Sequence, residues 1–238
     1  MNNILSLNDI NEGLHFLSLG GIGEIGANCY LYGCDGKWIM IDLGLSFADD
    51  KFPGVDLLVP KIDNIENIQD KLEAIVISHG HEDHAGAVAF FANKIKCPVY
   101  ATKFAMLLIE NRLKEFNKIE GFILNELSLD EELILNNFKL NFIPTTHSIP
   151  EPSAILIQTS YGSLLHTADW KIDNSPTLGN PFSKHQFEKI GNEGILALIG
   201  DSTNANVPGT SKSENDVREE LTKIFSRFSN RIVVTCFS

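Results

Sequence analysis

The chain has 238 residues, 43% of them hydrophobic and 21% charged, and its formal net charge is −12. This length suits one large α/β domain, or one domain with the start of a second, and the composition is that of an ordinary soluble globular protein. The acidic balance argues against a nucleic-acid partner, because phosphate backbones are bound mainly by Lys and Arg, but metal ions or a separate basic domain would offset it.

No apolar run reaches the roughly eighteen residues that a membrane span needs. The N-terminus also lacks a basic residue before its short apolar part, unlike a secretory signal. We therefore expect a cytoplasmic protein with no membrane partner. The cysteines, Cys29, Cys34, Cys97 and Cys236, lack CxxC spacing, and we expect four free, buried thiols. Cys29 and Cys34 are five apart, so one strand would place them on opposite faces.

The first third of the chain predicts a β-meander, with short strands at 14–19, 28–32 and 38–42. The glycine-rich stretch 20–26 invites a dinucleotide-binding interpretation, but no helix pattern follows it, as that motif requires. We interpret the stretch as a tight loop that brings backbone close to a metal site. Asp42 ends the third strand, either as a turn residue or as a carboxylate that supports a site.

The next strand, expected at 74–78, runs directly into His79-Gly80-His81-Glu82-Asp83-His84. His79 and His81 are two apart and can point at one atom, while Asp83 and His84 follow where a helix can begin. Imidazole nitrogens and a carboxylate oxygen that converge on one spot are ligands for zinc or a similar divalent ion. The alternative is a polar loop with accidental histidines, since short motifs give false positives.

Helices and strands alternate around and after this motif. A short helix is expected near 65–71 and another through 88–91. A longer helix should run from a Thr102 cap to about Asn117. Its inner side is predicted to carry Leu108, Leu113 and Phe116. Strands are predicted at 98–101, in short pieces from 122 to 145 that end with 138–143, at 154–158, at 163–166, at 195–200 as a buried strand, and at 231–235.

A last helix should begin at a Ser213 cap, with Asp216 completing a capping box. Its apolar face would carry Val217, Leu221, Ile224 and Phe228.

Three further polar residues stand where an apolar strand stops. These are His147, Asp169 and Asp201. A layered α/β fold gathers such residues along one edge, so each is a candidate to complete the metal cluster. His166 lies inside a predicted strand and is expected to be a satisfied core histidine, whereas His185 is expected in a solvated loop.

These residues together resemble a known family. HxHxDH at His79 to His84, then His147 and Asp169, resemble the metallo-β-lactamase superfamily of dinuclear metal hydrolases. Four stretches narrow the resemblance to the ribonuclease J family, the β-CASP branch that processes RNA. They lie at 20–28, 146–150, 166–173 and 201–205, and the resemblance covers essentially the whole chain.

The resemblance implies an αββα sandwich at 1–200, with metals at the edge of its two sheets, and an incomplete β-CASP domain at 201–238. It assigns one zinc ion to His79, His81 and His147. The second zinc ion would be held by Asp83, His84 and Asp169, with Asp169 bridging. Asp42 would support the site from behind. Asp83, Asp169 and Asp201 would serve catalysis, and Ser202 and Thr203 would contact substrate.

The implied activity is metal-dependent hydrolysis of RNA, both 5′–3′ exonucleolytic and endonucleolytic, with two Zn²⁺ ions sharing a hydroxide; Mn²⁺ or Mg²⁺ could replace zinc. Members of the family continue well past this length, with a further metal-ligating histidine, a general-acid histidine and often an oligomerising domain. We therefore expect a truncated chain that binds metal at His79, His81 and His147 but shows little or no ribonuclease activity alone. The alternatives are a hydrolase of small thioesters or lactones, and a non-catalytic remnant that acts as a binding module.

Overall fold

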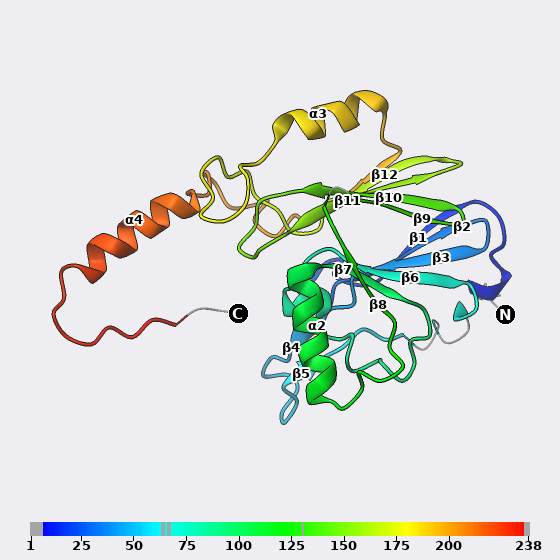
Figure 1. The fold of residues 1–238 in the computed structure, drawn as a ribbon, viewed down its shortest axis with the longest axis horizontal. Helices are drawn as coiled ribbons and strands as arrows, with labels where there is room; N and C mark the ends of the chain where they lie inside the picture. Colours follow the sequence, from blue (N-terminus) through cyan, green and yellow to red (C-terminus); the bar gives the residue numbers. More distant parts are fainter. Residues whose placement is uncertain (1–6, 63–64, 66–67, 130, 236–238) are drawn as a thin grey trace.

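Nearly every strand places alternate side chains in two different apolar environments, so each of the two sheets is covered on both faces. A computed structural model describes residues 7–62, 65, 68–129 and 131–235. Two sheets face each other, with helices on their outer sides (Figure 1). The predicted αββα arrangement is thereby confirmed.

The first sheet has six strands in the order β1-β2-β3-β6-β7-β8. The first three form the predicted antiparallel meander, and β3, β6, β7 and β8 are parallel. Their bounds are β1 Leu14–Gly20, β2 Cys29–Cys34, β3 Lys37–Ile41, β6 Leu72–Ile77, β7 Val99–Thr102 and β8 Leu124–Leu127. A separate antiparallel pair joins β4 Ser46–Phe47 to β5 Leu57–Leu58.

The second sheet has the order β13-β12-β11-β10-β9 and is antiparallel except for the parallel pair of β12 and β13. Its strands are β9 Glu132–Leu135, β10 Phe138–Pro144, β11 Ser153–Thr159, β12 Gly162–His166 and β13 Ala197–Ile199. The helices are the 3-10 turn η1 Leu7–Asp9, α1 Glu82–Ala85, α2 Lys103–Glu115, α3 Lys184–Glu193 and α4 Glu214–Phe225. Among the described residues, no helix is long and apolar enough to cross a membrane.

The core between the sheets takes one face of each strand. Tyr32 and Val76 of the first sheet meet Phe138 and other apolar residues of the second. The opposite faces of β3 and β6 pack with α1 and α2, and the outer face of the second sheet packs with α3. Cys29 and Cys34 lie in different cores, as their spacing predicts, and with Cys97 they are free and buried. Cys236 lies outside the described residues.

The helix predicted through 88–91 is wrong, because successive turns replace it. The carbonyl oxygens that would continue α1 are taken by two other loops, one between β1 and β2 and one after β3. Asn28 N–H donates to the carbonyl of Asp83 (3.0 Å), and Leu43 N–H donates to the carbonyl of His84 (2.8 Å). The helix expected near 65–71 lies partly outside the described residues, and the described part forms turns.

Predicted burial is wrong at three places. In α2 the buried residues include Met106, Ile109 and Leu113, whereas Leu108 and Phe116 are exposed. The strand predicted as buried at 195–200 is the edge strand β13, and its Leu198 is 66% exposed. An edge strand packs on one side only, so an apolar run does not guarantee burial.

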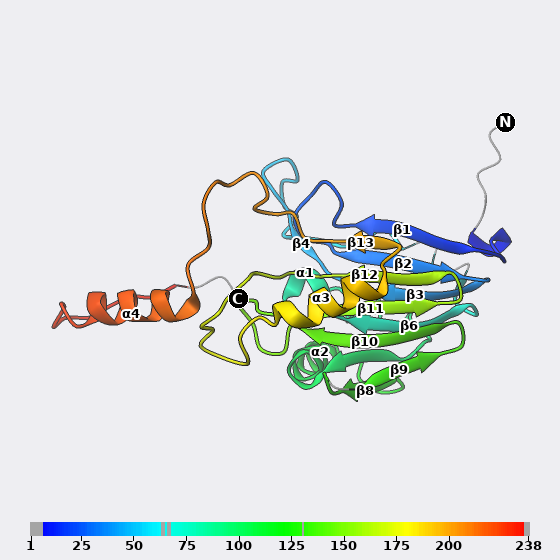
Figure 2. The same ribbon diagram turned by 90° about the horizontal axis from the view of Figure 1, so that it is seen from above.

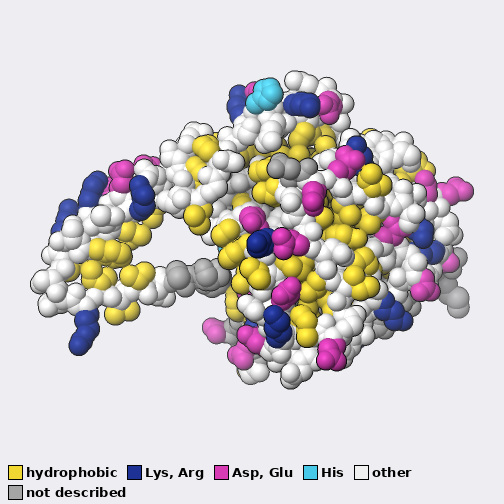
Figure 3. Space-filling view, viewed as in Figure 1, with side chains coloured by type: hydrophobic (Ala, Val, Ile, Leu, Met, Phe, Trp, Pro, Cys, Tyr) yellow, Lys and Arg dark blue, Asp and Glu magenta, His cyan; other side chains and the backbone are white. Residues whose placement is uncertain are grey.

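The C-terminal segment departs from expectation as well. Residues 231–235 form no strand, because no described strand lies beside them to pair with. The Ser213 capping box with Asp216 is confirmed. Helix α4 projects from the two sheets (Figures 1 and 2), and hydrophobic side chains gather along this segment in Figure 3. Those exposed in α4 and just beyond include Val217, Leu221, Ile224 and Phe228.

Candidate metal centre

The polar residues of the centre follow the ends of strands that, within each sheet, run in the same direction. Asp42 follows β3, His79 follows β6, His147 comes three residues after β10, and Asp169 comes three residues after β12. Because parallel strands end at the same edge of a sheet, four side chains that are far apart in sequence meet at one edge of the sandwich.

Three imidazoles converge at this edge. His81 Nδ1 lies 3.1 Å from His79 Nε2 and 3.1 Å from His147 Nε2, and all three ligand atoms lie within 4.8 Å of one another. Ligand nitrogens held about 2.0–2.1 Å from a tetrahedral zinc ion lie roughly 3.3 Å apart. The three-histidine group therefore has the donor atoms and the spacing that a zinc ion requires.

A second group lies beside the first and shares His79 with it. Ligand atoms of His79, His84 and Asp169 also lie within 4.8 Å of one another. His84 Nε2 is 3.2 Å from Asp169 Oδ1 and 3.7 Å from Asp83 Oδ2. The other oxygen of Asp169, Oδ2, lies 3.5 Å from His147 Nε2. One carboxylate thus faces both groups.

Asp42 supports His84 from behind. It is completely buried, and its carboxylate accepts hydrogen bonds from Ser78 N–H (2.7 Å) and Ser78 Oγ (2.8 Å) while lying 2.7 Å from His84 Nδ1. A carboxylate on one ring nitrogen leaves the other nitrogen as the ligand and fixes the ring orientation. Asp42 and Ala168 both have positive φ angles, 60° and 48°, a strained conformation that clusters at functional sites.

Burial and neighbouring charges set the protonation of these groups. Burial lowers the pKa of His147 to about 4 and holds that of His79 well below its usual range, so both rings are neutral near neutral pH. Burial also favours the neutral form of His84, but Asp42 and Asp169 outweigh it and raise the pKa of that ring to about 10. Hydrogen bonding and charge from His84 lower the pKa of Asp169 against the effect of its burial. His79 and His147 are thus neutral imidazoles and Asp169 is an ionised carboxylate, which are the forms that bind divalent metals, whereas His84 has to release its proton when a metal ion binds.

The glycine-rich loop lies where the sequence places it, against the centre. It lines a cavity of about 360 Å³ together with Asp83, His84 and Asp169.

The loop after β3 packs directly against α1. A Cβ atom on Gly44 would overlap the backbone of Asp83. A glycine is required there because two backbone segments meet without room for a side chain.

Asp201, Ser202 and Thr203 line the same cavity. Asp201 N–H donates to Thr167 Oγ1 (3.1 Å), and the Asp201 carboxylate accepts from Thr203 N–H (2.8 Å). They therefore lie beside the metal ligands without being part of either ligand group.

His166 also lines this cavity. It is buried, its Nδ1 lies 2.9 Å from Tyr32 Oη, and its Nε2 has no hydrogen-bond partner within the described part of the chain.

The remaining histidines lie away from the centre. His185 is exposed and lies in the first turn of α3, so the prediction of a loop there is wrong. His15 is only partly exposed and its Nε2 lies 2.7 Å from the carbonyl of Glu12.

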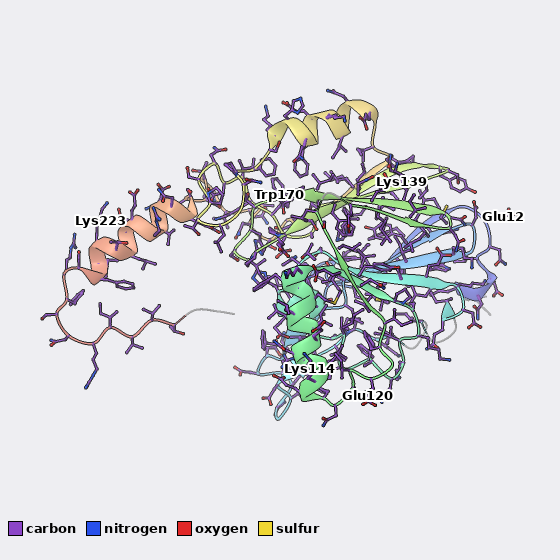
Figure 4. All side chains as sticks on the ribbon, viewed as in Figure 1. Glu12, Lys114, Glu120, Lys139, Trp170 and Lys223 are labelled. Atoms are coloured by element: carbon purple, nitrogen blue, oxygen red, sulfur yellow. The ribbon has the colours of Figure 1, made fainter. Side chains whose placement is uncertain are left out.

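The loop that follows Asp169 is anchored to the loop that carries His147. Lys171 N–H donates to the carbonyl of Thr146 (2.9 Å), and Asp173 N–H donates to Thr146 Oγ1 (3.3 Å). Trp170, labelled in Figure 4, stacks on Phe182 with ring centroids 6.0 Å apart. These contacts keep His147 and Asp169 at a fixed separation.

Sequence reasoning missed several supporting residues. Ser78 bonds Asp42, Thr146 anchors the His147 loop, and Asn28 and Tyr30 form a hydrogen-bonded pair against the metal ligands. Ser78 and Thr146 each precede a candidate histidine, and Asn28 ends the glycine-rich stretch. Position beside a ligand was the signal that could have found Ser78 and Thr146, whereas Asn28 and Tyr30 reach the ligands only through the fold.

The fold and the two neighbouring ligand groups define an αββα domain with a candidate metal centre at the edge of its sheets. A family model described as the metallo-β-lactamase superfamily matches residues 22–206, and the chain belongs to this superfamily. Divalent metal binding follows from that membership and from the two ligand groups.

Two curated relatives match almost the whole chain. Ribonuclease J of Sinorhizobium meliloti is 41% identical over 233 residues, which cover 96% of this chain and 41% of the relative. Ribonuclease J of Thermus thermophilus is 36% identical over 232 residues, which cover 94% of this chain and 40% of the relative. The chain therefore spans about two fifths of the length of these relatives.

A solved structure supports the fold alone. The crystal structure of a protein of unknown function from Enterococcus faecalis superposes with a TM-score of 0.61 at 17% identity, covering 92% of this chain and 58% of that one.

Proposed function

We propose that this chain supplies the metal centre of a hydrolase that cuts RNA phosphodiester bonds, in the manner of ribonuclease J. The observation that carries the proposal is the position of Asp169, whose two oxygens face His84 on one side and His147 on the other. A carboxylate between two ligand groups is what a dinuclear centre needs. The curated relatives named ribonuclease J support RNA as the substrate.

In this proposal His79, His81 and His147 hold one ion, and Asp83, His84 and Asp169 hold the other. Imidazole donors suit Zn²⁺, while the carboxylates of the second group also suit Mn²⁺ or Mg²⁺, so we propose zinc first. Bound divalent ions supply Lewis acidity, which activates water and stabilises charge on phosphoryl oxygens. They also offset the acidity of a chain whose net charge is −12, which would otherwise repel RNA.

The chain's own residues contribute orientation and proton handling. Asp42 holds the His84 ring so that Nε2 faces the centre, and Asp83 and Asp169 present carboxylate oxygens to the cavity where a water molecule would be oriented. Burial raises the pKa of Asp83, which brings its carboxylate closer to the range in which it can accept and release a proton. Asp201, Ser202 and Thr203 would contact substrate at the far side of the cavity.

The division into a metallo-β-lactamase domain at 1–200 and the start of a β-CASP domain at 201–238 is part of this proposal. A cytoplasmic location, and homo-oligomers that form through regions outside these 238 residues, are part of it too.

The small-molecule hydrolase alternative is not favoured, because the curated relatives that match over nearly the whole chain are named for ribonuclease activity.

The test assays the protein expressed from its complete gene on 5′-monophosphorylated RNA, with a thioester substrate in parallel. We expect RNA hydrolysis that a chelator abolishes and that Zn²⁺ or Mn²⁺ restores, and no thioester hydrolysis. His81→Ala should lower the rate at least about a hundredfold, because it removes one metal ligand.

The matched control is His185→Ala, which changes an exposed histidine of α3. Its RNA hydrolysis should equal that of the unmodified protein. Hydrolysis of the thioester alone, or RNA hydrolysis that persists without metal, would contradict the proposed function.

A further inference from the structure

We propose that Asn28 is a positioning residue, which aims the carboxylate of Asp83 at the second metal ion and is itself oriented by the hydroxyl of Tyr30. This inference rests on the proposed dinuclear centre and deepens it. The glycine-rich loop contributes no residue to either ligand group, and this inference gives the end of that loop a role.

The backbone of Asn28 lies between two segments of the centre. Its N–H donates to the carbonyl of Asp83 (3.0 Å), and its carbonyl accepts from Gly44 N–H (2.8 Å). The preceding residue, Ala27, donates its N–H to the carbonyl of Leu45 (2.9 Å) and has a φ angle of 51°. These bonds fix the Cα position of Asn28 relative to α1. The side chain of Asn28 is therefore held next to the ligands of the second group.

The side chain of Asn28 ends between the ligands of the second group. Its Nδ2 lies 3.1 Å from His84 Nε2 and 3.4 Å from Asp83 Oδ2. The amide nitrogen donates to the Asp83 carboxylate, which stays an acceptor whether or not His84 carries its proton. Both neighbouring atoms belong to the proposed second metal site, and neither belongs to the three-histidine group.

Tyr30 fixes which end of the amide faces the ligands. Its hydroxyl donates to Asn28 Oδ1 over 2.8 Å. Burial and the charge of Asp42 raise the pKa of Tyr30, so the hydroxyl keeps its proton and stays a donor. The Tyr30 ring packs against His166 with centroids 4.9 Å apart, which holds the hydroxyl in place. The amide oxygen is thus occupied, and the nitrogen is turned toward Asp83.

Asp83 benefits from such positioning because its side chain is 33% exposed and lies in the first turn of the four-residue helix α1. A partly exposed carboxylate loses rotamer freedom when it binds a metal ion, which reduces the affinity. A hydrogen bond that orients it beforehand removes part of this cost. Loss of comparable supporting hydrogen bonds lowers metal affinity about 10- to 100-fold.

The experiment titrates the metal-free chain expressed from its complete gene with Zn²⁺ and, separately, with Mn²⁺, by calorimetry, and counts bound ions by elemental analysis. His84→Ala identifies which of two binding events belongs to the second group. We expect two ions in the unmodified chain. Asn28→Ala should weaken the ion assigned to His84 about 10- to 100-fold and leave the affinity of the other ion unchanged.

Tyr30→Phe is the second variant, because it keeps Asn28 and removes only the bond that orients the amide. It should weaken the same ion severalfold and leave the other unchanged. Asn141→Ala is the matched control, since Asn141 lies on β10 and bonds Glu132 away from the centre. Its two affinities should equal those of the unmodified chain. Thermal unfolding of the metal-free variants checks that each is folded.

The outcomes separate this inference from the proposed function. Two ions in the unmodified chain, with affinities that Asn28→Ala and Tyr30→Phe leave unchanged, would overturn the role of Asn28 and leave the dinuclear centre standing. Equal weakening of both ions would also overturn it, because that result indicates a general structural role. A single ion or none in the unmodified chain would overturn both.

Discussion

The Nδ1 atom of His84 lies 2.7 Å from Oδ2 of Asp42, and both side chains are almost fully buried. The carboxylate is held in turn by the backbone and hydroxyl of Ser78. His84 therefore cannot rotate without breaking a buried charge-assisted hydrogen bond, which is roughly twice as strong as a neutral one. This relationship fixes the orientation of His84 within the second ligand group.

Asp42→Asn should weaken metal binding at His84 about 10- to 100-fold, because the amide cannot hold the ring as the carboxylate does. It should also destabilise the metal-free protein, since the buried Ser78 hydroxyl and His84 ring lose their charged partner. Calorimetric titration and urea unfolding measure the two effects. The control is Asp49→Asn, an exposed change outside the centre. An Asp42 variant with unchanged metal affinity would show that the carboxylate is only a turn residue.

The stability of the metal-free protein should fall as the pH is lowered from about 7 to about 4, and His166 is one cause. Burial lowers the pKa of His166 to about 4, below the value of 6.5 for an unperturbed histidine. The unfolded chain therefore takes up this proton first, so stability that is present above pH 6.5 is lost as the pH falls towards 4. The loss amounts to about 3 kcal/mol for this residue, and urea unfolding across this pH range measures it.

His166→Asn keeps a hydrogen-bonding group near Tyr32 and should reduce the pH dependence, whereas His185→Asn should leave it unchanged. Equal slopes in both variants would contradict the assignment to His166.

Gly44→Ala should destabilise the protein by about 3 kcal/mol and weaken metal binding, because its Cβ would overlap the backbone of Asp83 and force α1 away from β3. Gly191→Ala is the control, since nothing lies near an added Cβ in α3. That variant should stay within about 1 kcal/mol of the unmodified protein or gain stability. Thermal unfolding compares the two, and a tolerated Gly44→Ala would refute the close approach.

Asp173→Asn should loosen α4. The buried carboxylate accepts hydrogen bonds from Ser213 Oγ (2.7 Å), Glu214 N–H (2.9 Å) and Ser175 N–H (2.9 Å), and it pairs with Lys171. Burial alone would raise the pKa of Asp173, but these bonds hold it well below its usual range.

Loss of the charge should cost about 2 kcal/mol locally and speed amide exchange in α4 roughly thirtyfold. Hydrogen-exchange mass spectrometry measures this, with Asp49→Asn as the unaffected comparison. Unchanged exchange in α4 would mean that other contacts hold the helix.

The sequence predicts the layered fold well, because strand side chains alternate between two apolar cores. Cys29 and Cys34 show this most simply, since their spacing alone places them on opposite faces of β2. It also predicts which polar residues gather, because His79, His147 and Asp169 follow strands that end at one edge. Their assignment to particular metal ions stays a prediction that the metal titrations test.

The failures of sequence reasoning are long-range effects. Helix α1 is short because Asn28 and Leu43 take its next carbonyl groups, and no local pattern encodes a bond across 55 residues. Leu108 is exposed because only one stripe of α2 meets the sheet, and Ile109 lies on that stripe. The supporting role of Asn28 was missed for the same reason as the helix end.

The most direct test of the account is anomalous diffraction from crystals of the protein expressed from its complete gene and grown with Zn²⁺, recorded at the zinc absorption edge. We expect two peaks at the edge of the sandwich, one among His79, His81 and His147 and one beside His84 and Asp169. Peaks elsewhere, or no peak at these ligands, would contradict the dinuclear centre and the ribonuclease function built on it.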